Sequence, residues 1–317
     1  MKKTIQILLL GGIVSFVASP VNAQDSDTTY WTKGGVAALT FSQVSLTNWA
    51  AGGNNNVSVN GYFNLYADYK KDKIDWSNNL EMGYGIVKQG ENAVPQKTDD
   101  IIIATTQLGY SLKGDKLFWS SLLDFRTQFY EGIDSEGNRI SDFMAPGYLL
   151  IATGLDWKPN ADFSVTYAPV TGKFTFVGDE ELAANGAFGV DPGLRDPITG
   201  AIVQNGSSSR AELGSFLKVR YKKDNIVKNV NFSSKLELFT NYLQDFGNID
   251  VNWQNLIAMK VNSWLTVNWQ TQLIYDDDIK IAGGVNASGE PTNFAPRTQF
   301  KSVFGVGLSF KFGDQKG

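Results

Sequence analysis

Residues 57–69 read Val-Ser-Val-Asn-Gly-Tyr-Phe-Asn-Leu-Tyr-Ala-Asp-Tyr, and this stretch decides the fold. Apart from Gly61, its odd positions are apolar, whereas its even positions carry Ser, Asn, Tyr and Asp. Successive side chains of a strand point to opposite faces, so the alternation predicts a strand with one apolar and one polar face. Globular strands usually run to about five or six residues, whereas a strand that crosses a bilayer needs roughly 9–11. The length therefore predicts a membrane-spanning strand.

The same alternation recurs along the chain. It predicts twelve strands, at 34–45, 56–70, 73–88, 99–112, 116–130, 146–158, 161–177, 209–222, 225–243, 248–262, 264–277 and 298–312. An open sheet edge in hydrocarbon would leave unpaired backbone groups, so the first strand must pair with the last. The fold class that follows is all-β: a transmembrane antiparallel up-and-down β-barrel of about 12 strands.

The connections between these segments alternate in length. Tight turns are predicted at 71–73, 113–115, 159–160, 223–224 and 262–263, and longer loops at 46–55, 89–98, 131–145, 178–208 and 278–297, with 244–247 a short exception. Outer-membrane barrels have short periplasmic turns and long extracellular loops, so we expect both termini in the periplasm. The long extracellular loop at 178–208 is either a functional lid or plug, or a loop without a specific task.

Aromatic residues gather at the ends of the apolar faces. Such rings favour the boundary between hydrocarbon and headgroups, although aromatic residues also favour strands in general. We predict two aromatic girdles, one on the short-turn side at Tyr69, Trp76, Tyr110, Trp119, Trp157, Tyr221 and Trp264, and one on the long-loop side at Tyr84, Phe129, Tyr242 and Tyr275.

The N-terminus carries export features. Lys2 and Lys3 precede an apolar run at 5–17, and residues 21–23 read Val-Asn-Ala, which predicts a signal peptide at 1–23 and a single barrel domain over 24–317. We therefore expect the outer membrane of a Gram-negative bacterium, with lipid and lipopolysaccharide as surroundings and barrel-assembly machinery as a partner in biogenesis. The final strand, with Phe310 and Phe312, resembles the signal that this machinery reads, although residues 313–317 follow it.

The composition excludes several kinds of chemistry. The chain has no His and no Cys, which removes the commonest general base, thiolate chemistry and most zinc sites. It has no concentrated basic stripe, so we expect no nucleic-acid partner. No cofactor, no metal site and no enzymatic activity are predicted.

Several short sequence motifs of this chain resemble those of an uncharacterised family of outer-membrane proteins predicted in Bacteroidota. The family is defined by a domain of unknown function. The motifs are Asn-Trp-Ala-Ala-Gly-Gly at 48–53, Tyr-Ala-Pro at 167–169, Phe-Gly-Val-Asp-Pro-Gly at 188–193, the strand that carries Glu212, Asn-Tyr at 241–242, Asn-Ile-Asp-Val at 248–251 and Leu-Ile-Tyr-Asp-Asp-Asp at 273–278. The resemblance implies location and fold, and it transfers no activity to any residue. The phrase at 48–53 is either a partner-binding element or a loop that Trp49 folds back over the rim.

Charges of both signs fall on the predicted inner face. The lumen-lining candidates are Asp124, Arg126, Glu212, Lys218, Arg220, Lys235 and Glu237. Rings of charged side chains set selectivity in pores, but such charges can equally form a neutralised network that fills the barrel. Twelve strands lie between filled eight-stranded barrels and open porins of about 16–18 strands, so both readings stay open. The run Asp276-Asp277-Asp278 is either a hard-cation site or a solvated loop base.

Three functions are considered from these observations. One of them, an outer-membrane enzyme such as a lipid hydrolase, is disfavoured because such chemistry usually uses His as base and the chain has none. The first of the other two is a narrow pore or channel for small solutes. The alternative is a structural or accessory subunit of an outer-membrane assembly or export complex, with a filled barrel and other outer-membrane proteins as partners.

Overall fold

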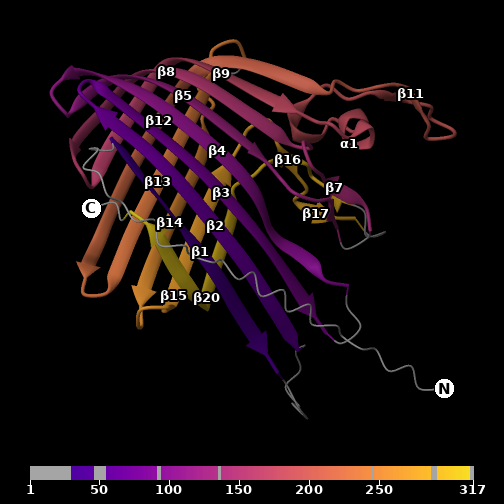
Figure 1. The fold of residues 1–317 in the computed structure, drawn as a ribbon. Coiled ribbons are helices and arrows are strands. Elements are labelled where there is room, and N and C mark those ends of the chain that lie inside the picture. The colour runs from indigo at the N-terminus through magenta and orange to yellow at the C-terminus, as the bar shows by residue number, and fades with distance from the viewer. Residues whose placement is uncertain are drawn as a thin grey trace.

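Twelve strands close into a single antiparallel barrel (Figure 1). The computed structural model describes residues 30–45, 55–90, 94–134, 137–244, 246–286 and 291–314. In barrel order the strands are β1 (Trp31–Val44), β2 (Asn56–Lys71), β3 (Ile74–Gln89), β4 (Gln96–Lys113), β5 (Leu117–Thr127), β8 (Gly147–Asn160), β9 (Phe163–Phe176), β12 (Ser209–Val227), β13 (Val230–Asn241), β14 (Asp250–Lys260), β15 (Leu265–Tyr275) and β20 (Gln299–Gly313). The barrel closes where β1 pairs with β20, so the predicted fold class and the closure of first strand on last are confirmed.

Strand positions follow the sequence prediction closely, but two turns are displaced. The turn expected at 159–160 lies at 161–162, because β8 continues to Asn160. The turn expected at 223–224 is wrong: β12 continues to Val227, and a two-residue turn at 228–229 joins it to β13. Asn229 adopts φ 66°, a left-handed conformation that Asn tolerates. Asn225, at φ 51°, instead lies in an irregularity of the strand register between Lys223 and Val227. The residues predicted as the turn, Lys223 and Asp224, therefore lie within β12 at this irregularity.

The register shows which side chains face the lumen. Arg126 on β5 reaches Glu237 on β13, and these strands are not neighbours in the barrel, so the face that carries them is the inner one. Paired residues share a face. On this basis the even positions of β2, such as Asn64, point inward, and the odd positions, such as Phe63, point outward, where Phe63 stacks on Phe312. The alternation at 57–69 thus separates lumen from exterior as predicted.

Small secondary structures gather at the long-loop end (Figure 1). They are the hairpins β6 (Gly132–Ile133) with β7 (Arg139–Ser141), β10 (Leu194–Arg195) with β11 (Ile202–Gln204), β16 (Lys280–Ile281) with β19 (Ala295–Pro296) and β17 (Gly284–Val285) with β18 (Pro291–Thr292), together with helix α1 (Glu180–Ala184) and the 3-10 turn η1 (Ala187–Gly189). The sequence did not predict them. Among the described residues, no helix is long and apolar enough to cross a membrane.

The loop at 178–208 is anchored to the barrel. Asp179 caps α1 by accepting a hydrogen bond from the backbone N–H of Leu182 at 2.8 Å. Leu182, Ala183 and Val190 pack with Ala145 and Val177 in a buried apolar cluster at the end of β8 and β9. The loop is therefore a folded cover over this end of the wall.

The aromatic residues predicted for the girdles lie near the strand ends. On the short-turn side, Trp119 and Trp157 are each 49% exposed on the outer face. Trp31 joins this group, because its ring centroid lies 5.2 Å from that of Tyr69 and 5.6 Å from that of Trp76. On the other side, Phe129 and Tyr242 lie just beyond the ends of β5 and β13. The predicted signal peptide at 1–23 and the phrase at 48–53 fall outside the described residues.

Candidate functional site

A network of ion pairs crosses the lumen at mid-depth, and we call it the chord. Its members are Asp124 and Arg126 on β5 and Lys235 and Glu237 on β13. Arg126 on β5 is paired with Asp124 on the same strand and with Glu237 on β13, the latter at 2.8 Å. Glu237 also accepts a hydrogen bond from Asn252 at 3.3 Å, and Lys235 lies 3.8 Å from it. Asp124 accepts a further bond from Thr105. Both carboxylates are 7% exposed, so the charges are buried and neutralised by their partners.

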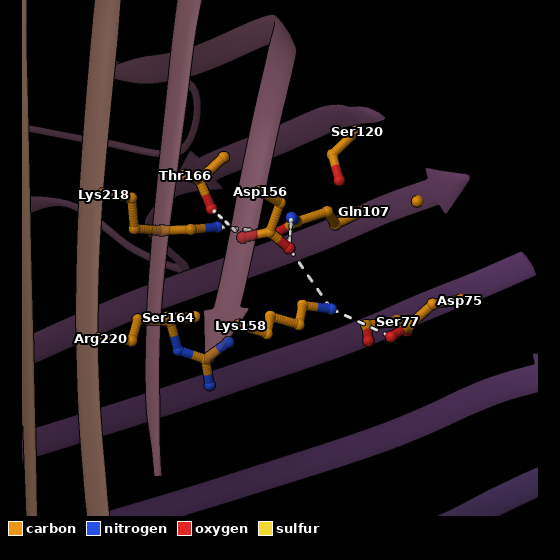
Figure 2. A pocket seen from close by; sticks show the side chains of 11 residues that line it. Asp75, Ser77, Gln107, Ser120, Asp156, Lys158, Ser164, Thr166, Lys218 and Arg220 are labelled. Carbon is orange, nitrogen blue, oxygen red and sulfur yellow. Dashed lines mark hydrogen bonds and ion pairs between the residues drawn. The ribbon is translucent and has the colours of Figure 1, made fainter. Parts of the chain in front are cut away.

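A second polar layer lies nearer the short turns (Figure 2). Asp156 on β8 accepts hydrogen bonds from Thr166 at 2.8 Å and from Gln107 at 3.0 Å, and Lys158 lies 3.3 Å from it. Gln107 in turn accepts from Lys218 on β12, and Lys158 reaches Asp75 on β3 at 3.0 Å. The cavity between these side chains measures about 40 Å³, which is room for water and not for a solute.

A third charged layer lies at the long-loop end. Lys173 on β9 is surrounded by three carboxylates, those of Asp250 at 2.7 Å and of Glu212 and Asp276 at 3.6 Å each. Arg210 pairs with Glu212 and with Asp278. The remaining member of the acidic run, Asp277, accepts from Asn248 and Tyr275. The three consecutive aspartates therefore interact with different partners. The described residues contain no group of acidic side chains arranged to hold a metal ion.

An apolar band separates the layers on one wall. Leu122, Ala152, Ala168 and Phe216 lie on β5, β8, β9 and β12, and each is at most 4% exposed. Leu150 packs against them. We call β5, β8, β9, β12 and β13 the packed wall, because their inward side chains are buried against one another and against the ion-paired layers.

The opposite wall is different. Inward positions of β14, β15, β20, β1 and β2, which we call the open wall, include Tyr62 at 40% exposure, Leu256 at 37% and an exposed Gln270. Around them the inner face carries neutral polar side chains, Asn60, Asn64, Asn252, Gln254, Asn268 and Gln272. Charged inward residues of β14 and β20 lie toward the strand ends, at Asp250, Lys260, Lys301 and Lys311. Inward side chains of the open wall are therefore more accessible to solvent than those of the packed wall.

The structure places all seven predicted lumen residues on the inner face, but in different groups. Arg126, Asp124, Lys235 and Glu237 form the chord, Lys218 and Arg220 line the small cavity of Figure 2, and Glu212 belongs to the long-loop layer. None of them lies on the open wall. The accessible residues Tyr62, Leu256 and Gln270 were not among the candidates, because a neutral side chain at an alternating position carries no signal that separates one wall from another.

These features define the class of the protein. A closed barrel of antiparallel strands with an apolar outer face, aromatic residues near both ends of that face and a polar interior is a transmembrane β-barrel of the outer-membrane type. The outer membrane is therefore its location.

Comparison with known proteins adds a family match over part of the chain. Residues 41–133 match the model of a family described as "Protein of unknown function (DUF3078)". The predicted resemblance to an uncharacterised family is confirmed over this part, and the bacterial phylum stays a prediction. A search of curated proteins finds no match to the chain.

Several solved structures are similar to this chain at low sequence identity. The COG4313 outer membrane channel from Pseudomonas putida F1 is 12% identical, with 90% of this chain and 96% of that chain covered and a TM-score of 0.39. The NanC porin is 10% identical, with coverages of 88% and 100% and a TM-score of 0.34. The translocator domain of the autotransporter NalP from Neisseria meningitidis is 9% identical, with coverages of 91% and 90% and a TM-score of 0.32. At these scores, function has to be inferred from the chain's own residues.

Proposed function

We propose that the protein is a narrow outer-membrane channel for small polar solutes, with an off-centre passage along the open wall. The observation that carries this proposal is the contrast in exposure between inward side chains. Leu122 and Phe216 on the packed wall are each 4% exposed, whereas Leu256 and Tyr62 on the open wall are 37% and 40% exposed. A barrel filled throughout would bury both sets.

The lining favours uncharged solutes. At mid-depth, β14 and β15 present the carboxamides of Gln254, Asn268, Gln270 and Gln272, which both donate and accept hydrogen bonds. The central charges are held in the chord, where each is neutralised by a partner. Because selectivity among ions needs net charge along the route, we expect weak ion selectivity together with passage of small hydroxylated or amide-bearing solutes.

The barrel is oriented with its short turns in the periplasm. With an even number of strands, Trp31 at the start of β1 and Gly313 at the end of β20 both lie on the short-turn side, which supports this orientation for an exported chain. Lipid and lipopolysaccharide surround the apolar face, and barrel-assembly machinery inserts the chain. Neither a nucleic-acid partner nor an enzymatic step forms part of this proposal.

Purified protein in planar bilayers tests the proposal. We expect stepwise conductance increments with a small unit size. A bilayer that stays silent while the protein shows a folded barrel by circular dichroism would overturn it. That result would favour the accessory-subunit alternative, which the filled lumen beside the packed wall supports. The test of that alternative is stable co-purification of neighbouring proteins in mild detergent.

A further inference from the structure

The barrel is closed over only part of its seam. β1 and β20 pair from Gly34 with Gly313 to Phe41 with Val306, and the pairing ends there. Both strands continue beyond this point toward the long loops, β1 to Val44 and β20 back to Gln299. Continued in register, Ser42 would lie opposite Gly305, yet no pairing joins 42–44 with 303–305. By contrast, β15 pairs with β20 up to Gln299.

This opening lies in the outer half of the membrane-spanning region. Along β15, Phe300 lies opposite Leu273 and Phe304 opposite Trp269, which are lipid-facing positions below the ring of Tyr275. Phe300 and Phe304 are 67% and 63% exposed, whereas Trp269, which has neighbouring strands on both sides, is 46% exposed. At Phe304, whose in-register position on β1 is the unpaired Gln43, the greater exposure is what a missing neighbour on that side produces.

The opening adjoins the passage. β15, β20, β1 and β2 belong to the open wall, and inward from the gap Val303 lies opposite Gln270, which in turn lies opposite Leu256. The gap itself has small residues at its rim, Ser42 and Gly305. The charged side chain of this part of β20, Lys301, is paired with Asp99 on β4 at 3.1 Å. The charged side chain in this part of β20 is therefore held by a partner, and the methyl group of Thr40 lies over Gly305 at the edge of the gap.

The chemistry of the rim has two parts. Phe41, Phe300 and Phe304 offer apolar contacts on the lipid side. The backbone edges of 42–44 and 303–305 offer N–H and C=O groups, which are strongly unfavourable in hydrocarbon unless they find partners. An occupant with an apolar tail and a hydrogen-bonding head satisfies both parts.

We propose that the unpaired stretch of the β1–β20 seam, at 42–44 and 303–305, is a lateral opening through which amphipathic molecules move between the lumen and the outer leaflet. This proposal rests on the proposed function in one respect, because the lateral opening leads into the proposed passage along the open wall. Its occupants share one chemistry, an apolar chain joined to a polar head, whether a membrane lipid or a free amphiphile.

Cross-linking tests the opening directly, because the chain has no cysteine of its own. The test pair is Gln43→Cys with Phe304→Cys, and the matched control is Leu39→Cys with Leu308→Cys, a paired position four residues along β1 that also faces outward. Disulfides need Cα atoms about 4.4–6.8 Å apart, so under mild oxidation the test pair should form about tenfold more slowly than the control. Equal rates would overturn the proposal.

Lipid access gives the second measurement. A bimane label on Val303→Cys, beside the opening, is compared with one on Gln254→Cys, an inward position on a strand that is paired on both sides. In vesicles of brominated phosphatidylcholine we expect the label at 303 to be quenched at least twice as strongly as that at 254. Free dodecyl maltoside, added to the same brominated vesicles below its critical micelle concentration, should reduce the quenching at 303 if free amphiphiles enter; quenching that it leaves unchanged restricts the occupant to lipid.

The two proposals fail separately. Conductance with equal quenching at both labels would remove the lateral opening and keep the channel. Stronger quenching at 303 in a barrel that gives no conductance would remove the channel and keep the opening.

Discussion

The packed and open walls of this barrel are built from the same alternating strands, yet they differ in what faces the lumen. The packed wall carries buried charges in pairs and a buried apolar band, whereas the open wall carries neutral amides and accessible residues. A buried charge must be neutralised, so charges gather where the lumen is filled. In the channel proposed above, the inward charges of the packed wall therefore mark the filled part of the lumen, and the neutral polar positions of the open wall mark the proposed passage.

Breaking the chord should have the largest effect. Arg126→Ala leaves Asp124 and Glu237 buried without their shared cation, and we expect a loss of about 3–5 kcal/mol in the free energy of unfolding. The measurement is urea unfolding in phosphatidylcholine vesicles. As the control, Lys301→Ala breaks the more exposed pair with Asp99 on the open side and should cost about 0–1 kcal/mol.

A triple variant separates charge from packing in this result. Asp124→Asn, Arg126→Met and Glu237→Gln together remove the charges while keeping similar volumes, so most of the stability lost in Arg126→Ala should return. Equal costs for Arg126→Ala and Lys301→Ala would contradict the distinction between the two walls.

Substitution of two inward-facing leucines compares how tightly the two walls are packed, without any change of charge. Leu122→Ala opens a cavity in the packed wall and should cost about 2–5 kcal/mol, whereas Leu256→Ala removes a side chain already 37% exposed and should stay within about 0.5 kcal/mol. The same unfolding measurement applies to both. If the two costs were alike, the lumen would be filled on both sides and the passage would be lost.

Charge placed on the open wall should change ion selectivity with little effect on stability. Gln270→Glu and Gln270→Lys introduce opposite charges at one accessible position, so the reversal potential in a potassium chloride gradient should shift toward cations for the first and toward anions for the second. Shifts of the same sign, or none, would place the passage elsewhere.

The smallest effect concerns the cover over the packed wall. Burial acts against a low pKa at Asp179, but hydrogen bonds from the Leu182 N–H and from Arg139, together with the charge of Arg139, bring the pKa below its usual value. A lowered folded pKa means that the cap contributes fully above the ordinary aspartate range and that this contribution is lost as the pH falls through the lowered value. Asp179→Ala should cost about 0.5–2 kcal/mol of local stability.

Hydrogen exchange of the α1 amides at 180–184 measures this local stability. Exchange in the wild type should accelerate on acidification, relative to the intrinsic rate, and in Asp179→Ala it should already be fast at neutral pH. A variant that still protects α1 and keeps the same pH profile would show that the apolar cluster alone holds the cover.

How far sequence reasoning reached can be judged from particular elements. The alternation at 57–69 and in the other strands correctly predicted which faces are apolar, and turn residues such as Asp72 marked most of the short connections. At Asn225 and Asn229 two turn signals lie four residues apart, and only the pairing of β12 with β13 decides that the first is a bulge and the second the turn. The small hairpins and α1 at the long-loop end carry no comparable periodic signal.

By itself, the sequence determined the strands, their two faces and the membrane as surroundings, because a period of two residues is a local property of the chain. Only the tertiary structure decided that Arg126 meets Glu237, that the open wall is lined by Gln270 and that the seam stops pairing at Phe41. Arg126 and Glu237 are 111 residues apart in the chain. Contacts across a lumen depend on the curvature and stagger of the whole barrel, and no local pattern of residues encodes them.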